Sequence, residues 1–305
     1  MSAVSVAAGS GRRLWLFYAL AVVALWGVWG TLSGLSAAHG FPDTLVYCVW
    51  ALTMIPPAVF VLWRGGWQLD RTPRAVIYGL LIGLLGAGGQ MLLFRTLTLG
   101  PAYFIFPIIS LSPVITIVLS FLLLRERTGK LGALGIVLAL VSLPLLDLSF
   151  GQGAQGMGWF AFALLIMLAW GLQAYFMKLA NNSVSADSIF FYMTVGALLL
   201  APMAWAMTDW SQPINMGIDG PWMTAAIQIL NAIGALALVY AFRYGKAIVV
   251  APLTNAGAPL VTAALSLLFA GVVPGPLKIV GLLLALVASL LLVLEPERPA
   301  PSPTA

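Results

Sequence analysis

Charged side chains are scarce in this sequence. Asp, Glu, Lys and Arg make up 8% of the 305 residues, whereas hydrophobic residues make up 62%. A soluble domain carries roughly a quarter charged residues, so the composition excludes an ordinary soluble fold. The apolar residues form long continuous runs, not alternating segments of about ten residues, which excludes a membrane β-barrel. Because lipid offers no partners to free backbone groups, the sequence predicts an all-α integral membrane protein.

Residues that bind metals or act as nucleophiles are also few. Cys48 is the one cysteine, so no intrachain disulfide forms, and His39, the one histidine, lies in a predicted loop. The chain has no HExxH motif and no carboxylate at the middle of an apolar run. An intramembrane enzyme needs a nucleophile with a base, or a metal site. We therefore predict no enzymatic activity, no metal site and no cofactor.

The positions of the carboxylates also bear on energy coupling. Proton-coupled antiport usually relies on a titratable group within the membrane. All nine acidic residues fall in loops or near the ends of apolar runs. We therefore predict that strong proton coupling is absent and that a permanently cationic substrate would lack a carboxylate partner. Glu126, between Arg125 and Arg127, is predicted to form a local ion pair or to cap the following helix.

Ten apolar runs are long enough to cross a bilayer, which takes about 20 residues. The predicted spans are 14–37, 44–63, 75–99, 101–124, 130–149, 157–180, 186–207, 221–244, 246–270 and 275–294. The run from Leu14 to Leu35 is too long for a signal peptide and is interpreted as the first span. The Pro-rich tail, 295–305, is predicted to be disordered and cytoplasmic.

The basic residues predict the orientation of these spans. If the N-terminus is cytoplasmic, 12 of the 14 Lys and Arg residues fall on the inside, and only Arg95 and Lys278 fall outside. This distribution follows the positive-inside rule. We therefore expect a multi-pass protein of a bacterial-type inner (plasma) membrane with both termini cytoplasmic. The net charge of +5 arises from these flanks and does not indicate a nucleic-acid partner.

The chain repeats itself with an offset of about 145 residues. The matched pairs are Trp26 and Trp170, Gly27 and Gly171, Pro57 and Pro202, Gly89 and Gly234, Gly100 and Gly245, Pro107 and Pro252, Pro113 and Pro259, and Gly135 and Gly281. Each half holds an odd number of spans, so the second half enters the membrane from the opposite side. The sequence thus predicts two inverted five-helix repeats, residues 1–150 and 151–294.

This pattern resembles the drug/metabolite transporter superfamily, and specifically its ten-helix EamA-type members. The residues that carry the resemblance are ALWGVWG in the first span, LAWGLQAYFMK in the sixth, and the joint LLLRERTGKLGALGIVLALVSL with Glu126. In the second half the position that matches Glu126 falls near Gly271, and no acid is present. The resemblance implies a transporter, with zwitterionic amino acids and related metabolites as the best-supported substrate class.

Polar amides and aromatic residues of the spans are the candidate substrate ligands. Intramembrane polar residues tend to face a cavity or another helix, and amides provide donors and acceptors without charge. Trp stacks on flat solutes or holds a cation by its π face. The predicted substrate-binding residues are Trp26, Gln90, Tyr103, Trp170, Gln173, Asn231, Tyr240 and Asn255. Contacts between helices are the alternative role for each of them.

Prolines at repeat-equivalent positions of spans four and nine are candidate hinges. A proline inside a helix removes one hydrogen bond and displaces the carbonyl four residues earlier. The four positions are Pro107, Pro113, Pro252 and Pro259. Their alternative role is a packing kink.

Three basic residues lie near the ends of the spans. Arg95 is predicted to pair with Asp147 as an outer gate or to bind a substrate anion, and its alternative role is to extend toward the membrane interface. Lys178 and Arg243 are predicted to extend toward the interface.

The sequence therefore predicts a transporter that exports a small polar metabolite, an amino acid or related zwitterion, by alternating access. A sugar, polyol or nucleoside is the alternative substrate class, since amides and tryptophans suit these solutes too. A structural membrane protein without transport is the alternative of another class. The expected partners are the small-molecule substrate and the lipid bilayer, and the expected state is a monomer or a weak homodimer.

Overall fold

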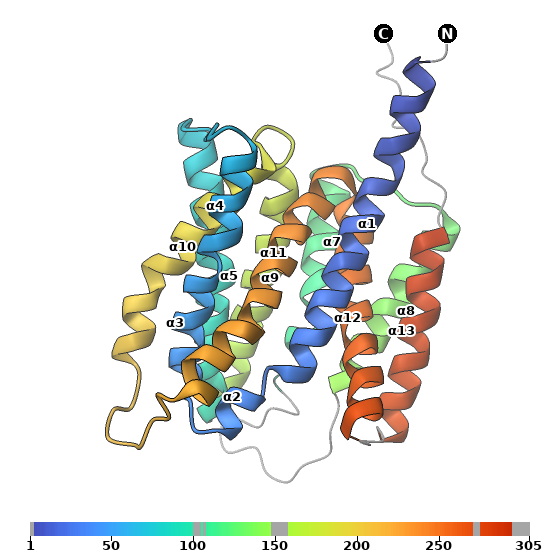
Figure 1. Cartoon of the computed structure of the whole chain (residues 1–305). Helices are drawn as coiled ribbons and strands as arrows, with labels where there is room; N and C mark the ends of the chain where they lie inside the picture. Colours follow the sequence, from blue (N-terminus) through green and yellow to red (C-terminus); the bar gives the residue numbers. More distant parts are fainter. Residues whose placement is uncertain (1–2, 100–104, 106–107, 148–157, 271–274, 295–305) are drawn as a thin grey trace.

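The computed structural model is a bundle of helices that run in alternating directions (Figure 1). It describes the backbone of residues 3–99, 105, 108–147, 158–270 and 275–294. The helices in order are α1 Ala3–Leu32, α2 Leu35–Ala38, α3 Asp43–Thr53, α4 Ile55–Arg64, α5 Pro73–Leu99, α7 Ser112–Leu122, α8 Lys130–Asp147, α9 Gly158–Ala180, α10 Ala186–Ala206, the π-helical turn η1 Ile218–Trp222, α11 Met223–Tyr244, α12 Ala247–Ala270 and α13 Pro276–Leu294.

Ten apolar helical segments account for the predicted spans. Among the described residues, eight are long and apolar enough to cross a membrane, and two shorter apolar helices, Ser112–Leu122 and Lys130–Leu145, stand at spans four and five. The predicted all-α fold with two five-helix repeats is thereby confirmed. The second span is divided at Met54, between α3 and α4, and Pro56 lies in the first turn of α4. A proline is tolerated there because the first N–H groups of a helix have no intrahelical partner.

The two halves are interleaved. Helix α1 of the first half packs on α11 and α12 of the second, and α9 of the second half packs on α5 and α7 of the first. The contacts match in detail, because Thr262 Oγ1 donates to the Gly27 carbonyl at 2.9 Å and Thr116 Oγ1 donates to the Gly171 carbonyl at 3.0 Å. The two helix pairs that these hydroxyls join, α12 with α1 and α7 with α9, are repeat-equivalent, so the internal repeat is visible in individual hydrogen bonds.

Gly79 and Gly83 of α5, which form a GxxxG pair, serve helix packing. A Cβ atom on Gly79 would lie 2.4 Å from Cβ of Tyr192, and one on Gly83 would lie 2.6 Å from the Met193 carbonyl. Both contacts join α5 to α10. Small residues permit this close approach in lipid, where side-chain packing replaces the hydrophobic effect between helices.

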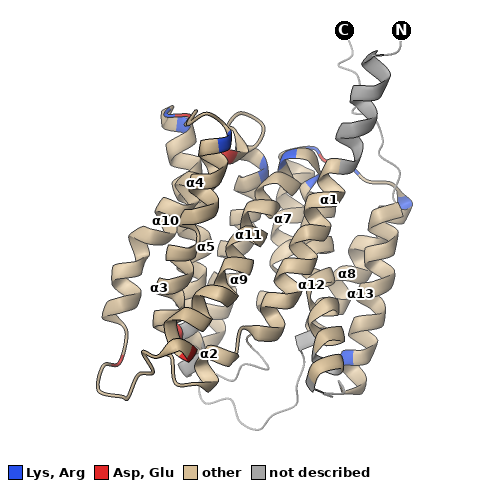
Figure 2. Cartoon of the chain, in the orientation of Figure 1, with Lys and Arg blue, Asp and Glu red and all other residues tan. Residues whose placement is uncertain are grey.

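The basic residues gather at one end of the bundle. Figure 1 shows that α1 begins and α13 ends at the same end. Most of the Lys and Arg residues that Figure 2 colours blue lie at this end, which we call the termini end. Lys278 lies in the first turn of α13, a helix that begins at the opposite end. This unequal distribution of basic residues between the two ends agrees with the distribution predicted from the sequence.

Candidate functional site

A cavity of about 300 Å³ lies at the centre of the bundle, between the helices of both halves. Its walls come from α1, α3, α5, α7, α9, α10, α11 and α12. Its polar and aromatic lining residues are Trp26, Trp29, Trp50, Gln90, Ser112, Thr116, Trp170, Gln173, Asn231, Phe242, Thr254 and Asn255. No charged side chain lines it among the described residues. The volume suits a small solute.

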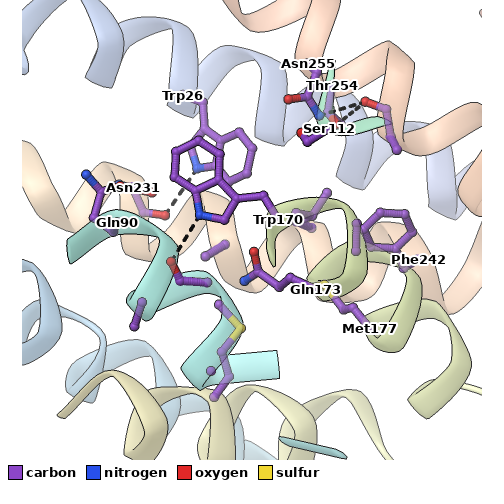
Figure 3. A pocket seen from close by; sticks show the side chains of 18 of the residues that line it. Trp26, Gln90, Ser112, Trp170, Gln173, Met177, Asn231, Phe242, Thr254 and Asn255 are labelled. Atoms are coloured by element: carbon purple, nitrogen blue, oxygen red, sulfur yellow. Dashed lines mark hydrogen bonds between the residues drawn. The ribbon is translucent and has the colours of Figure 1, made fainter. Parts of the chain in front are cut away.

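Two tryptophans at repeat-equivalent positions lie at the centre of the cavity (Figure 3). Trp26 Nε1 donates to the Asn231 carbonyl at 3.3 Å, and Trp170 Nε1 donates to the Gly86 carbonyl at 3.2 Å. The two acceptors are themselves 145 residues apart. Because each N–H group is occupied by a backbone carbonyl, the indoles contribute mainly their ring surfaces to the cavity.

Two further glycines make room for these indoles. A Cβ atom on Gly234 would lie 2.4 Å from Trp26 Nε1, and a Cβ atom on Gly89 would lie 2.4 Å from Trp170 Nε1. Glycine is therefore required by close approach at both positions, since a methyl group would displace the ring. The repeat thus preserves each tryptophan together with the glycine that accommodates it.

The side-chain amides of Gln90, Gln173 and Asn231 also line the cavity. None of the three forms a hydrogen bond with another residue in the part of the chain that the structure describes. Asn255 donates from Nδ2 to the Ala251 carbonyl at 2.9 Å, which leaves its side-chain oxygen as an acceptor. A neutral amide offers two donors and one acceptor oxygen, so this set suits a solute with both kinds of polar group.

Several cavity residues were not predicted from the sequence. Trp50 presents a buried Nε1 atom that has no hydrogen-bond partner among the described residues. Ser112, Thr116 and Thr254 add hydroxyl groups, and the latter two donate to carbonyls of Gly171 and Val250. The spacing of Ser112 and Thr116, which places both on one face of α7, was the available signal.

Tyr240 lies outside this cavity, which differs from the sequence-based prediction. Its hydroxyl donates to Asp187 Oδ1, and its ring stacks on Tyr18 with centroids 5.0 Å apart. Tyr240 thus lies on a face of α11 that is directed toward α1 and α10 and away from the bundle centre. The prediction failed because the residue type indicates a polar partner but does not indicate which side of the helix faces the cavity.

The prolines occupy different structural positions in the two repeats. Pro113 lies in the first turn of α7 after a break at Ser110 and Leu111, so it begins a helix and does not kink one. Pro252 and Pro259 both lie inside the continuous helix α12. Of these three, Pro113 lines the cavity. Pro107 and Tyr103 lie outside the described residues.

The predicted Arg95–Asp147 gate falls partly outside the described residues. Asp147 ends α8, but its side chain is not among those described. Arg95 is exposed on α5. The pairing therefore stays a prediction.

A buried charge pair closes the termini end of the bundle beside the cavity. Glu126 Oε1 lies 4.0 Å from Lys178 Nζ, and the two side chains are only 9% and 14% exposed. Glu126 Oε2 accepts a hydrogen bond from the Ile248 N–H at 3.1 Å, at the start of α12. The Glu126 contacts thus reach the second half of the chain. The predicted local ion pair or cap for α8 is not what the side chain forms.

Burial raises the pKa of Glu126 above its ordinary value. The Ile248 N–H and the Lys178 ammonium act in the opposite direction, because both stabilise the carboxylate. The first turn of a helix carries a partial positive charge, which also favours an anion at this position. The carboxyl group is therefore held in a partly dry site by charges from two helices.

The neighbouring cations satisfy carbonyls at the end of α11 and the end of α9. Lys178 Nζ donates to the Phe242 carbonyl at 3.0 Å and the Gly245 carbonyl at 2.6 Å. Arg243 donates to the carbonyls of Asn181 and Val184. The sequence predicted that both side chains extend toward the interface. They bind inward instead, because the last carbonyls of a helix lack intrahelical partners.

The described residues contain no group of three or more His, Cys, Asp or Glu side chains placed to hold a metal ion. The cavity donors are amides, hydroxyls and indoles, which are poor ligands for transition metals.

Comparison with known proteins gives consistent matches. The family described as the EamA-like transporter family matches residues 13–146 and again residues 157–294. Protein LicB of Haemophilus influenzae is 27% identical over 183 residues, 54% of this chain and 61% of that protein. An uncharacterized protein of Methanocaldococcus jannaschii is 33% identical over 76 residues, 25% of this chain and 56% of that protein. The matches therefore span about three fifths of each of these relatives.

A protein of known crystal structure has the same fold. It superposes with a TM-score of 0.75 at 18% sequence identity, and the match covers 91% of this chain and 98% of the other. At this identity the likeness concerns the fold alone.

Proposed function

Because the chain belongs to the EamA-like transporter family, we propose that this membrane transporter exports a small polar metabolite, an amino acid or related zwitterion, by alternating access. The observation that carries the substrate class is the neutral lining of the central cavity. Amides of Gln90, Gln173 and Asn231 offer donors and acceptors without a net charge. A zwitterion presents a donor group and an acceptor group and likewise has no net charge, so it matches this lining.

Alternating access is supported by the equivalence of the two halves. Inverted repeats exchange two mirrored states around a midplane site. Trp26 and Trp170 form matching hydrogen bonds across the two half-to-half contacts, so the same contact can loosen on either side. The proposed hinges are the prolines at repeat-equivalent positions, Pro113 and Pro259, which lie at the start of α7 and inside α12.

The termini end is the proposed inner gate. The Glu126–Lys178 pair lies next to Met177 and Phe242, two buried residues that line the cavity. Release of Glu126 from both Lys178 and the Ile248 N–H would free the start of α12 from the loop before α8. We assign both termini to the cytoplasm of a bacterial-type inner membrane on the distribution of basic residues. We expect a monomer or a weak homodimer.

Weak proton coupling is part of the proposal. No carboxylate lines the cavity among the described residues, so a proton would not compete directly with the substrate. Among the described residues, Glu126 is the acid that belongs to the proposed inner gate. Flux in liposomes with and without a pH gradient tests this point. A strong dependence on the gradient that Glu126→Gln abolishes would contradict the proposal and assign coupling to Glu126.

A sugar, polyol or nucleoside is the second candidate substrate. The ring surfaces of Trp26 and Trp170 favour it, since indoles stack on flat or apolar faces of such solutes. The amides fit their hydroxyl groups as well as they fit a zwitterion.

A thermal melting screen of the detergent-purified protein distinguishes the candidates. A ligand that binds only the folded state raises the melting temperature by mass action. We expect a shift with amino acids or neutral polar solutes, which Asn231→Ala and Trp170→Ala weaken and Gln68→Ala, on the exposed surface, leaves unchanged. A shift with organic cations alone would refute the proposed substrate class. A shift that survives both cavity variants would place the ligand elsewhere.

A further inference from the structure

A second cavity, of about 530 Å³, lies between α1, α4 and α11. It shares no lining residue with the central cavity. Its walls are formed by Phe17, Tyr18, Ala21, Leu25, Phe60, Val61, Ile233, Leu236, Ala237 and Tyr240, together with Arg64, Gly65 and Asp187. Phe17 is 66% exposed and Phe60 is 52% exposed, so aromatic side chains flank its outer side. We call this cavity the α1–α4 groove.

The groove is polar at one end and apolar along its length. From Tyr18 to Leu25 the helix α1 advances seven residues, which is about 10 Å at 1.5 Å per residue. Helix α11 contributes an equal length, from Ile233 to Tyr240. The polar groups stand at the termini end, where Arg64 is the last residue of α4 and Asp187 lies in the first turn of α10. The apolar walls extend from there toward the middle of the bundle.

The two charges at the polar end are not paired with each other. Among the described residues, the Arg64 side chain forms no hydrogen bond and no ion pair. Asp187 accepts a hydrogen bond from the Tyr240 hydroxyl on Oδ1 and lies in the first turn of α10. A guanidinium group and a carboxylate therefore line the same end of the groove, each able to take a ligand of opposite charge.

We propose that the α1–α4 groove binds a phospholipid of the surrounding bilayer whose head group carries a primary ammonium. Arg64 binds the phosphate, since guanidinium matches phosphate oxygens in a bidentate geometry. Asp187 receives the ammonium, and an acyl chain lies along Phe17, Phe60 and Leu25. The order of these groups matches a lipid, because the charged end of the groove is at the end of the spans, where head groups lie. A water-soluble solute would gain little from an apolar groove that faces the lipid.

This inference does not depend on the transported substrate, because the two cavities are separate. It depends on the membrane location, which the family membership and the apolar helices establish. A bound lipid between α1 and α4 would fill the space beside α11 and so stabilise the contact of α11 with both helices.

Native mass spectrometry of the detergent-purified full chain tests the proposal directly. The protein is titrated with phosphatidylethanolamine, phosphatidylglycerol and phosphatidylcholine, and the fraction with one bound lipid is measured. We expect phosphatidylethanolamine to bind most tightly and Arg64→Gln to weaken it about tenfold, the effect of one lost charge-assisted bond. Asp187→Asn should abolish the preference over phosphatidylglycerol. Arg74→Gln is the matched control, because Arg74 is an exposed cation at the same end but outside the groove.

A steric variant keeps the test valid if a charge variant does not fold. Ala21→Trp fills the groove without altering a charge and should remove the tightly bound lipid. Equal lipid binding by wild type, Arg64→Gln and Ala21→Trp would overturn the proposal. Equal losses in Arg64→Gln and Arg74→Gln would also overturn it, because they would indicate non-specific annular lipid. A lipid-free dimer that Ala21→Trp dissociates would assign the groove to a second copy of the chain and would likewise refute a lipid site.

Discussion

Replacement of Lys178 by Met, which removes a buried charge, should destabilise the protein more than the loss of a charge at an exposed position. The substitution keeps an unbranched side chain, one atom shorter, but removes the ammonium that lies 4.0 Å from Glu126. Unit charges at this distance attract by about 4 kcal/mol at an effective dielectric constant of about 20. The Phe242 and Gly245 carbonyls lose a charged donor as well. Breaking a buried pair costs about 3–5 kcal/mol, and we expect a loss of about 3 kcal/mol because the separation is long.

The free energy of unfolding, measured by SDS titration in mixed micelles, provides the assay. A double-mutant cycle adds Glu126→Gln and the double variant. Glu126→Gln should cost less than Lys178→Met, because Lys178 keeps both carbonyl acceptors. The double variant should be more stable than Lys178→Met alone, since no unpaired carboxylate remains. Lys246→Met is the control and should change stability by at most about 0.5 kcal/mol, because Lys246 donates to the Arg127 carbonyl at an exposed site.

Strict additivity in this cycle would refute the reasoning. It would mean that Glu126 and Lys178 do not interact in the membrane and that Glu126 is held by the Ile248 N–H alone. A loss in Lys246→Met as large as that in Lys178→Met would refute it too, because the effect would then follow net charge and not burial.

Three further predictions follow from the same contacts. Lys178→Met should regain stability on acidification below pH 7 more than the wild type, because burial already raises the pKa of Glu126 and loss of the ammonium raises it further. The folded state then takes up the proton at a higher pH than the unfolded state, so stability increases as the pH falls through the raised pKa. Unfolding measured as a function of pH checks this prediction. Parallel stability profiles of Lys178→Met and the wild type would contradict it. Gly234→Val and Gly89→Val should each reduce transport in liposomes about tenfold or more, because a Cβ atom at either position lies 2.4 Å from an indole nitrogen. Gly34→Val is the control and should leave transport unchanged, because a Cβ atom there meets no other atom within 4 Å. Normal flux in the first two variants would show that the indoles move freely. Tyr240→Phe should leave ligand-induced melting shifts intact while lowering stability, and a lost shift would return Tyr240 to the central site.

The sequence predicted the architecture because the membrane reduces the possible folds to a few. Apolar runs of spanning length, an odd number of spans per half and pairs such as Trp26 and Trp170 suffice for an inverted repeat. Six predicted substrate ligands do meet around one cavity, because polar amides in apolar spans avoid lipid and turn inward.

The details that failed depend on helix rotation and on loop paths, which composition does not encode. Tyr240 and Asn231 lie on the same helix but on different faces, and only packing decides which face meets the centre. Glu126 accepts a hydrogen bond from the start of α12, and neighbouring Arg125 and Arg127 gave no sign of this in the sequence. Trp50 lines the cavity from α3, the part of the second span in which no repeat-matched pair was found.

The interleaving of the two halves has a consequence for biosynthesis. Helix α1 is synthesised long before α11 and α12, which pack on it, and the Gly27 face of α1 contacts Val261 and Ala258 of α12. Until α11 and α12 are inserted, this face of α1 is exposed in the bilayer to quality-control proteases and to the α1 helices of neighbouring nascent chains. If the two halves are expressed as separate polypeptides, each should therefore be degraded when it is expressed alone, and both should persist when they are co-expressed.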